Sequence, residues 1–252
     1  MNPSCIALLL IGSALTLPWI AAADPAQSPA SPAPLPLRST GPQTPIYKPP
    51  LLGAPATRVG GASRSGPAGD LVLSVLAPES TGLTSRARPT LYWYVAKRLA
   101  GPLEFALNDE HSIKPLVEMK VNATQPGIQA LPLTYPLKPG VEYQWVIAAV
   151  VDPGQRAGDL IAGGAIRRVE LPADLAGRLN RAGSSEQPAL YAEYGFWYDA
   201  LAELSEQIEA HPADPRRREH RAALLEQVGL HAIAQQDRVF SARSPEPDHA
   251  NH

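Results

Sequence analysis

The stretch that decides the fold is Val141–Val151, which reads VEYQWVIAAVV. Tyr143, Trp145 and Ile147 share one face of this run, while the opposite face carries a second, smaller set of apolar side chains. A period of two is typical of a β-strand, and apolar residues on both faces indicate a strand in the interior of a sheet. The sequence therefore predicts a central strand here, around which other strands must pack.

Six further β-rich runs flank this strand and are separated by Pro, Gly and Asp residues. Seven short strands at a spacing of roughly ten residues are the pattern of an all-β sandwich. The six runs are Leu71–Ala77, Thr90–Ala96, Leu103–Leu107, Leu116–Asn122, Ile128–Leu133 and Ile161–Leu171.

A short motif before the central strand, Leu137-x-Pro139-Gly140-x-x-Tyr143, refines this prediction. The spacing resembles the tyrosine corner of fibronectin-type-III and other immunoglobulin-like sandwiches, in which the Tyr hydroxyl bonds back to the preceding backbone. We therefore expect a structural role for Tyr143 and an immunoglobulin-like antiparallel β-sandwich over residues 59–172.

After Pro172 the apolar residues recur at spacings of three and four, which predicts helices. One helix is expected at Ala189–Ala210 and a second at about Pro215–Gln235, with a kink or cap at Gly229. The fold class is thus mainly β with α, and residues 173–240 form a helical hairpin packed on the sandwich. The pair loosely resembles a single tetratricopeptide unit, but one copy favours ordinary helix packing.

The N-terminus reads as an export signal over residues 1–23, with cleavage after Ala23. An uncleaved anchor is the alternative, because Met1–Ser4 carries no Lys or Arg. Residues 24–58 hold ten Pro in 35 residues and predict an extended tether, and 241–252 a disordered tail. We expect a periplasmic or secreted bacterial protein with no transmembrane segment in the mature chain.

Composition excludes several classes of function. The net charge of −2 argues against a nucleic-acid partner, and the only Cys, Cys5, lies in the signal, so the mature chain has no disulfide or thiol chemistry. No nucleotide, zinc-helix or hydrolase-elbow motif is present, so no cofactor and no metal site are expected.

Two clusters of titratable residues are candidates for binding. Asp109 and His111 form one pair, which we interpret first as a solvated hairpin end. Asp152, Arg156 and Asp159 form the second, in a Pro-Gly turn that lacks the ligand pattern of a calcium loop.

The large aromatic residues and the charged helices have two interpretations each. Trp93, Trp145 and Trp197 are most simply core anchors. Tyr92, Tyr94 and Tyr198 are also expected in the core, or alternatively on an exposed platform for a glycan or peptide. The first helix is acidic and the second begins with Arg216–Arg218 and Arg221, which we interpret as interhelix pairing rather than an anion site.

Several stretches together resemble one family. They are Arg58-Val59-Gly60-Gly61, Leu76-Ala77-Pro78-Glu79, Gly82-Leu83-Thr84, Arg88-Pro89-Thr90, Trp93-Tyr94-Val95, Pro126-Gly127-Ile128, Tyr143-x-Trp145, Asp152-Pro153-x-x-Arg156, Gly164-x-Ile166-x-Arg168, Gly195-x-Trp197-Tyr198-Asp199-Ala200-Leu201 and Gly229-Leu230. In order and spacing they resemble the bacterial domain of unknown function 928 family, from about Arg58 to Val239. The resemblance implies an exported protein and transfers no catalytic residue. The family often has a Cys where this chain has Val151 or Asp152, so a thiol role there is absent.

Three functions follow as expectations. The first is an exported, non-catalytic binding or envelope-scaffold protein whose partner is an unidentified envelope or secreted protein. The second is a periplasmic hydrolase with a site between sandwich and helices, built from Asp109, His111, Asp152 and Asp159. The third is a secretion accessory that binds cargo by strand addition at a sheet edge, for which Leu71–Ala77 is the candidate. The sequence favours a non-catalytic function without deciding it.

Overall fold

The strand predicted at Val141–Val151 is β7, Glu142–Ala149, and it lies in the interior of a five-stranded sheet. The sheet has the order β2-β8-β7-β4-β5. Its other strands are β2 (Gly82–Thr84), β4 (Leu103–Asp109), β5 (Val117–Val121) and β8 (Leu160–Arg168).

A second sheet of three strands has the order β1-β3-β6 and is antiparallel throughout. It is formed by β1 (Leu73–Val75), β3 (Thr90–Val95) and β6 (Gly127–Pro132). All seven predicted strands are therefore present, and the two sheets form a sandwich-like β structure.

The computed structural model describes residues 43–50, 58–59, 73–99, 103–109, 112–122, 125–150, 152 and 154–242. The proposed signal with Ala23, most of the predicted tether, His111 and the end of the predicted tail lie outside the described residues. None of the described helices combines the length and the apolarity that crossing a membrane requires.

The two sheets enclose a core made by alternate residues of their facing sides. Trp145, Phe105 and Trp93 are almost completely buried there, as the period-two pattern predicts. Beside the core, the backbone N–H of Lys138 donates a 3.0 Å hydrogen bond to the hydroxyl of Tyr143. This is the bond that the tyrosine-corner spacing predicts, and it fixes the entry into β7.

The structure differs from the predicted sandwich at β2. This three-residue strand was not predicted, and it pairs in parallel with the second half of β8, from Gly82 opposite Ile166 to Thr84 opposite Arg168. The sheet is therefore mixed rather than purely antiparallel.

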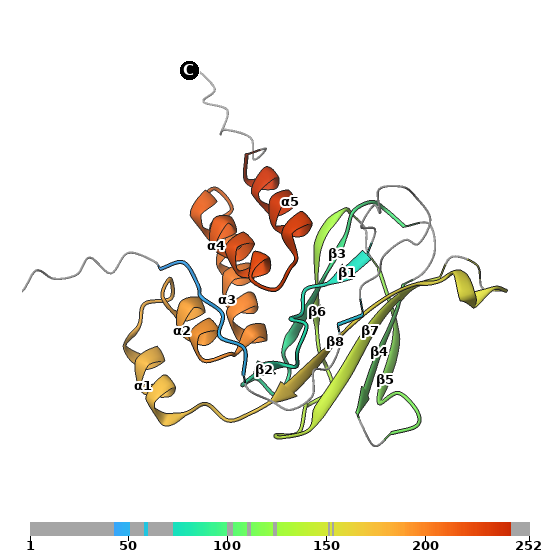
Figure 1. Ribbon diagram of the computed structural model, residues 1–252, viewed down its shortest axis with the longest axis horizontal. Coiled ribbons are helices and arrows are strands. Elements are labelled where there is room, and N and C mark those ends of the chain that lie inside the picture. The colour runs from blue at the N-terminus through green and yellow to red at the C-terminus, as the bar shows by residue number, and fades with distance from the viewer. Residues whose placement is uncertain are drawn as a thin grey trace, which may run out of the picture. The chain divides into compact units, whose positions relative to one another are not determined.

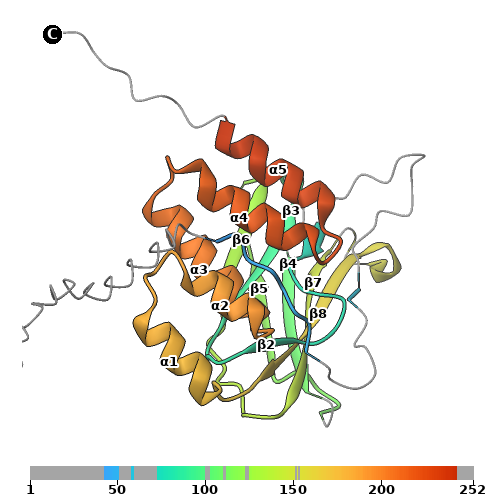
Figure 2. The ribbon, with the colours of Figure 1, turned by 60° about the vertical axis from the view of Figure 1, so that its left-hand side comes forward.

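The helical part is larger than the predicted hairpin. It contains five helices: α1 (Ala173–Arg181), α2 (Gln187–Glu193), α3 (Trp197–Ala210), α4 (Pro215–Glu226) and α5 (His231–Ala242). Helices α3, α4 and α5 lie beside the three-stranded sheet, which separates them from most of the five-stranded sheet (Figure 1). The turned view in Figure 2 shows α3, α4 and α5 stacked across the three-stranded sheet. Leu175 and Leu179 of α1 instead pack in one cluster with Leu83 of β2.

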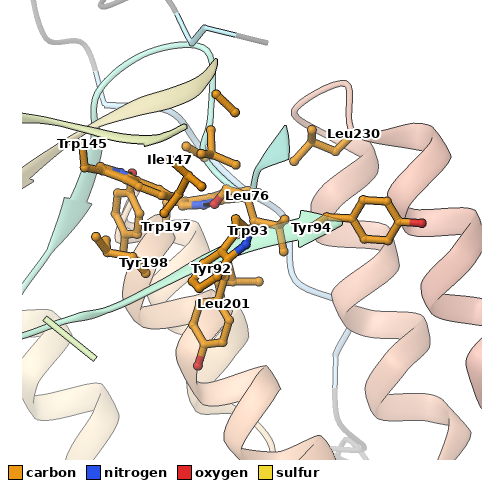
Figure 3. Close-up of a cluster of buried hydrophobic side chains, with 14 of the residues drawn as sticks. Leu76, Tyr92, Trp93, Tyr94, Trp145, Ile147, Trp197, Tyr198, Leu201 and Leu230 are labelled. Carbon is orange, nitrogen blue, oxygen red and sulfur yellow. Dashed lines mark hydrogen bonds between the residues drawn. The ribbon is translucent and has the colours of Figure 1, made fainter. Parts of the chain in front are cut away.

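Helix α3 inserts its first turn into the sandwich core. The Trp197 indole nitrogen donates a 2.9 Å hydrogen bond to the Leu76 carbonyl, and the Tyr198 hydroxyl donates one of 3.0 Å to the Ala165 carbonyl. The two rings lie beside Trp145 in Figure 3. Sandwich and helices thus share one hydrophobic core.

Residues 43–50 pack against the helices, which corrects the prediction of an extended tether for this segment. The Tyr47 ring packs edge-on against Trp197 with 5.0 Å between centroids. The Tyr47 N–H donates to Gln227 Oε1, and the Lys48 N–H donates to the Ala192 carbonyl. The segment is therefore part of the folded structure.

Candidate functional site

The predicted acidic site residues do not come together. Asp109 lies opposite Tyr143 at one end of the five-stranded sheet, whereas Asp159 precedes Leu160, which lies opposite Ala149 at the other end. Six residues of β7 separate the two ends, or roughly 20 Å at the rise of an extended strand. Catalytic groups must reach one substrate within hydrogen-bonding distance, so this placement does not support the hydrolase site expected from these residues.

The turn after β7 is held by local contacts. Asp152 Oδ1 accepts a hydrogen bond from the Gly154 N–H. The Arg156 guanidinium bonds both Asp159 and Glu104 Oε2, the latter at 2.7 Å. These ion pairs explain the predicted cluster, because they connect the turn to β4. Within the described residues no three His, Cys, Asp or Glu side chains converge as a metal site.

The interpretation of three tyrosines as an exposed platform is wrong. Tyr92, Tyr94 and Tyr198 are 4%, 7% and 1% exposed. Tyr198 also accepts a 2.9 Å hydrogen bond from the Trp145 indole, so its role is structural. Tyr92 and Tyr94 instead extend from β3 toward the helices (Figure 3), where they line a pocket.

This interlayer pocket lies between the three-stranded sheet and the helices and has a volume of about 310 Å³. Its sheet side is formed by Tyr92 and Tyr94 of β3 and by Pro126–Ala130 of β6. Its helix side is formed by Ser205, Ile208, Glu209, Arg218, Arg221, Ile233, Gln236 and Asp237. The volume is at the small end of known ligand sites and suits one or two amino-acid side chains.

The interlayer pocket contains an unusual buried ion pair. Arg221 donates from Nε and Nη2 to the two oxygens of Asp237 at 2.8 and 2.7 Å, and from Nη1 to Ser205 Oγ at 3.0 Å. The side chains of Arg221 and Asp237 are only 7% and 3% exposed. Tyr92 belongs to the same network, since burial raises its pKa while a hydrogen bond with Ser205 opposes that rise.

The sequence did not reveal this pair, because the Arg residues of α4 were expected to pair with the acidic helix before them, whereas Arg221 pairs with Asp237 of α5. A signal was present in α5, where Leu230, Ile233, Ala234 and Asp237 recur at spacings of three and four. That pattern places the carboxylate of Asp237 on the apolar stripe, and a buried carboxylate requires a cationic partner.

The edge strand β6 borders the interlayer pocket. Among the described strands it pairs only with β3. The Leu76 N–H bonds the Tyr92 carbonyl, so the backbone of Tyr92 and Tyr94 faces β1, while that of the alternate residues faces β6. The backbone groups of Ile128 and Ala130, which lie opposite these tyrosines, therefore point away from the sheet.

The three other edge strands of the described sheets differ from β6. Strand β2 is only three residues long, and all three are buried. The predicted edge at Leu71–Ala77 corresponds to β1, whose described residues are entirely buried, so it is not available. Strand β5 is exposed, but it carries Glu118 and Lys120, the kind of charges that protect sheet edges from pairing. Strand β6, with the sequence GIQALP, has no charged residue.

A larger pocket of about 490 Å³ lies between residues 43–48 and helices α1 and α2. Its charges are largely paired with one another, because Glu193 contacts both Lys48 and Arg178. The site has no edge strand beside it and none of the predicted site residues, so the β6 edge with the interlayer pocket is the stronger candidate.

Comparison with known proteins supports the resemblance seen in the sequence. No curated protein matches the chain. A family model does match residues 59–238, which cover the sandwich and most of the helical part. The chain therefore belongs to the family described as Domain of Unknown Function (DUF928).

Proposed function

We propose that this chain is an exported, non-catalytic binding protein of the bacterial envelope, which captures an extended segment of another protein as an added strand on β6. The observation that carries the proposal is the uncharged edge of β6 beside the interlayer pocket, an edge with which no other strand of the described residues pairs. Export rests on the signal-like N-terminus, residues 1–23.

We also infer that the sandwich is immunoglobulin-like, and this strengthens the proposal. In that fold one sheet contains strands A, B, E and D, and the other contains C, F and G with an optional C′. The sheets β1-β3-β6 and β8-β7-β4-β5 fit A-B-E and G-F-C-C′, with Tyr143 at the start of F. In this assignment β6 is strand E.

The missing strand is D, the neighbour of E. Only five residues, Asn122–Pro126, separate β5 from β6, which is too short for a strand and its two turns. A segment from a partner can take the empty place of D. This is strand addition, in which backbone hydrogen bonds supply affinity and pockets for alternate side chains supply specificity.

Photo-crosslinking in the native envelope tests the proposal. A photoreactive phenylalanine analogue is placed at Ile128 or at Ala130, and the adducts are mapped by mass spectrometry. Because both positions face the added strand, we expect adducts on one partner segment, at residues two positions apart. The matched site is Lys120 on β5, from which no adduct to that segment is expected.

Proline substitution separates strand addition from other contacts. Ala130→Pro removes one outward N–H and leaves the ladder to β3 intact, since edge strands tolerate Pro at such positions. It should abolish capture, whereas Ala130→Ser should retain it. Adducts without the two-residue offset, or capture that survives Ala130→Pro, would overturn the proposal.

A further inference from the structure

The buried network in the interlayer pocket has one positive charge in excess. Its cations are Arg218 and Arg221, and among the described residues that line the pocket Asp237 is the one deeply buried anion. Arg221 already occupies both oxygens of Asp237 at 2.8 and 2.7 Å. Arg218 reaches the same carboxylate only at 3.4 Å.

Arg218 is correspondingly poor in partners. Its Nε is buried and has no hydrogen-bond partner among the described residues, and its side chain is 20% exposed. Guanidinium groups are satisfied best by a planar, bidentate acceptor, and a buried donor without one is costly. The geometry therefore leaves a place for a carboxylate beside Arg218.

We infer that the interlayer pocket receives an aspartate or glutamate side chain of the captured segment and pairs it with Arg218. This inference rests on the proposed strand addition and names the chemistry of the partner. Ile128 and Ala130 lie on the pocket side of β6, so side chains of an added strand alternate between this side and the opposite one. Every second side chain of the added strand would therefore lie on the pocket side, next to the helices that line the pocket.

Glu209 is the one lining acid that opposes this charge. It is exposed on α3, so water screens its charge, whereas the side chains of Arg221 and Asp237 are 7% and 3% exposed and that of Arg218 is 20% exposed. The excess positive charge of the network around Arg218 therefore favours an anionic side chain of the captured segment over a cationic one.

A random decapeptide library displayed on phage, selected on the purified full chain, tests the inference. We expect the selected peptides to share one acidic position and to lose binding to the Ala130→Pro variant. Arg218→Gln should weaken acidic peptides by about ten- to a hundredfold, the range for losing a hydrogen bond to a charged group. It should leave versions of the peptides with Gln at that position unchanged.

The matched control is Arg216→Gln, two residues away on α4, where the side chain is 74% exposed and pairs with Asp214. Binding of acidic peptides to this variant should equal that to the unaltered chain. Thermal unfolding of each variant verifies the fold.

The possible outcomes distinguish the two proposals. Peptides that depend on Ala130 but show no acidic preference would overturn the carboxylate inference and leave strand addition standing. A selection without any Ala130-dependent peptide would overturn strand addition together with the inference. A dimer of this chain that dissociates on Ala130→Pro substitution would overturn capture of another protein, because a second copy of the chain would then lie on the β6 edge.

Discussion

The indole nitrogen of Trp145 on β7 donates a 2.9 Å hydrogen bond to the hydroxyl of Tyr198 on α3, and both side chains are buried. The same hydroxyl donates to the Ala165 carbonyl on β8. One phenol thus connects the helical part to two neighbouring strands. The sandwich and the helices are expected to unfold together, since separating them would leave these polar groups without partners.

Tyr198→Phe tests this connection. The variant retains the ring but leaves the Trp145 N–H and the Ala165 carbonyl unpaired in the core, so it should lower the free energy of unfolding by about 1–3 kcal/mol. Urea denaturation followed by tryptophan fluorescence and by circular dichroism should still give one coincident transition. Tyr194→Phe, which removes a hydroxyl bonded to the exposed Asp174, is the control and should cost less. Two separate transitions would contradict the shared core.

Close packing beneath the first turn of α3 gives a second prediction. A Cβ added to Gly164 would lie 2.6 Å from the Ala77 Cβ, a distance that forces the β8 backbone or its neighbour to move. Gly164→Ala should therefore destabilise the protein by about 1–3 kcal/mol, the usual cost of overpacking a core.

Gly158→Ala is the matched control for Gly164→Ala. Nothing lies within 4 Å of the added Cβ at Gly158, so its free energy of unfolding should change by a few tenths of a kcal/mol. Equal denaturation midpoints for the two variants would show that Gly164 is not a packing constraint.

The docked N-terminal segment gives a third prediction. Tyr47 is 8% exposed against Trp197, whereas its neighbour Ile46 is 66% exposed. Tyr47→Ala should cost about 3–5 kcal/mol, as for other large aromatic truncations, and Ile46→Ala very little. If both variants unfold at the same denaturant concentration, the segment does not belong to the stable fold.

Tyr47→Phe tests the same contact from the opposite direction. The Tyr47 hydroxyl is buried and finds no hydrogen-bond partner in the part of the chain that the structure describes, so removing it should leave stability unchanged or raise it. A substantial loss of stability would indicate a hydrogen bond at this hydroxyl.

The sequence predicts seven strands because each lies in a β-rich run bounded by turn residues, and Tyr143 because its corner spacing is specific. It does not predict β2, because Gly82–Thr84 lie in no such run and their pairing depends on β8, about 80 positions away. The single helix predicted over Ala189–Ala210 is divided by Gly195, which has a φ of +81°, and a Cβ added there would lie 3.0 Å from the Lys48 carbonyl oxygen. That division arises from tertiary contact with the docked segment.

The candidate site shows the same contrast. Tyr92 and Tyr94 are identifiable as a pair because adjacent alternate residues of one strand must share a face. Their partners Arg221 and Asp237 lie on different helices, and only the packing of α4 on α5 brings them together. Charge alone does not distinguish a buried pair from a solvated one, whereas the place of Asp237 on an apolar stripe does.

The last prediction concerns Asp199, which is completely buried at the start of α3. Its carboxylate accepts hydrogen bonds from the Ser85 N–H at 2.8 Å and the Ser85 hydroxyl at 3.2 Å, and it lies 3.5 Å from Arg86 Nε. Burial nevertheless raises the pKa of Asp199 to about 6, from an ordinary value of 3.8, and these contacts only partly oppose the rise.

An acid with a raised pKa in the folded state binds a proton there that the unfolded state has already lost. The free energy of unfolding therefore falls as pH rises from about 4 to about 6, by an amount on the order of 3 kcal/mol for this shift. Asp199→Asn cannot titrate, so the stability advantage of the unaltered chain over this variant should be largest below pH 4 and smaller above pH 6. Urea unfolding of both proteins between pH 4 and pH 7 measures the difference. The control is Glu206→Gln, which alters an exposed partner of Arg86 and should keep the pH dependence of the unaltered chain. If Asp199→Asn also keeps that pH dependence, Asp199 is ionised throughout this range and the prediction is wrong.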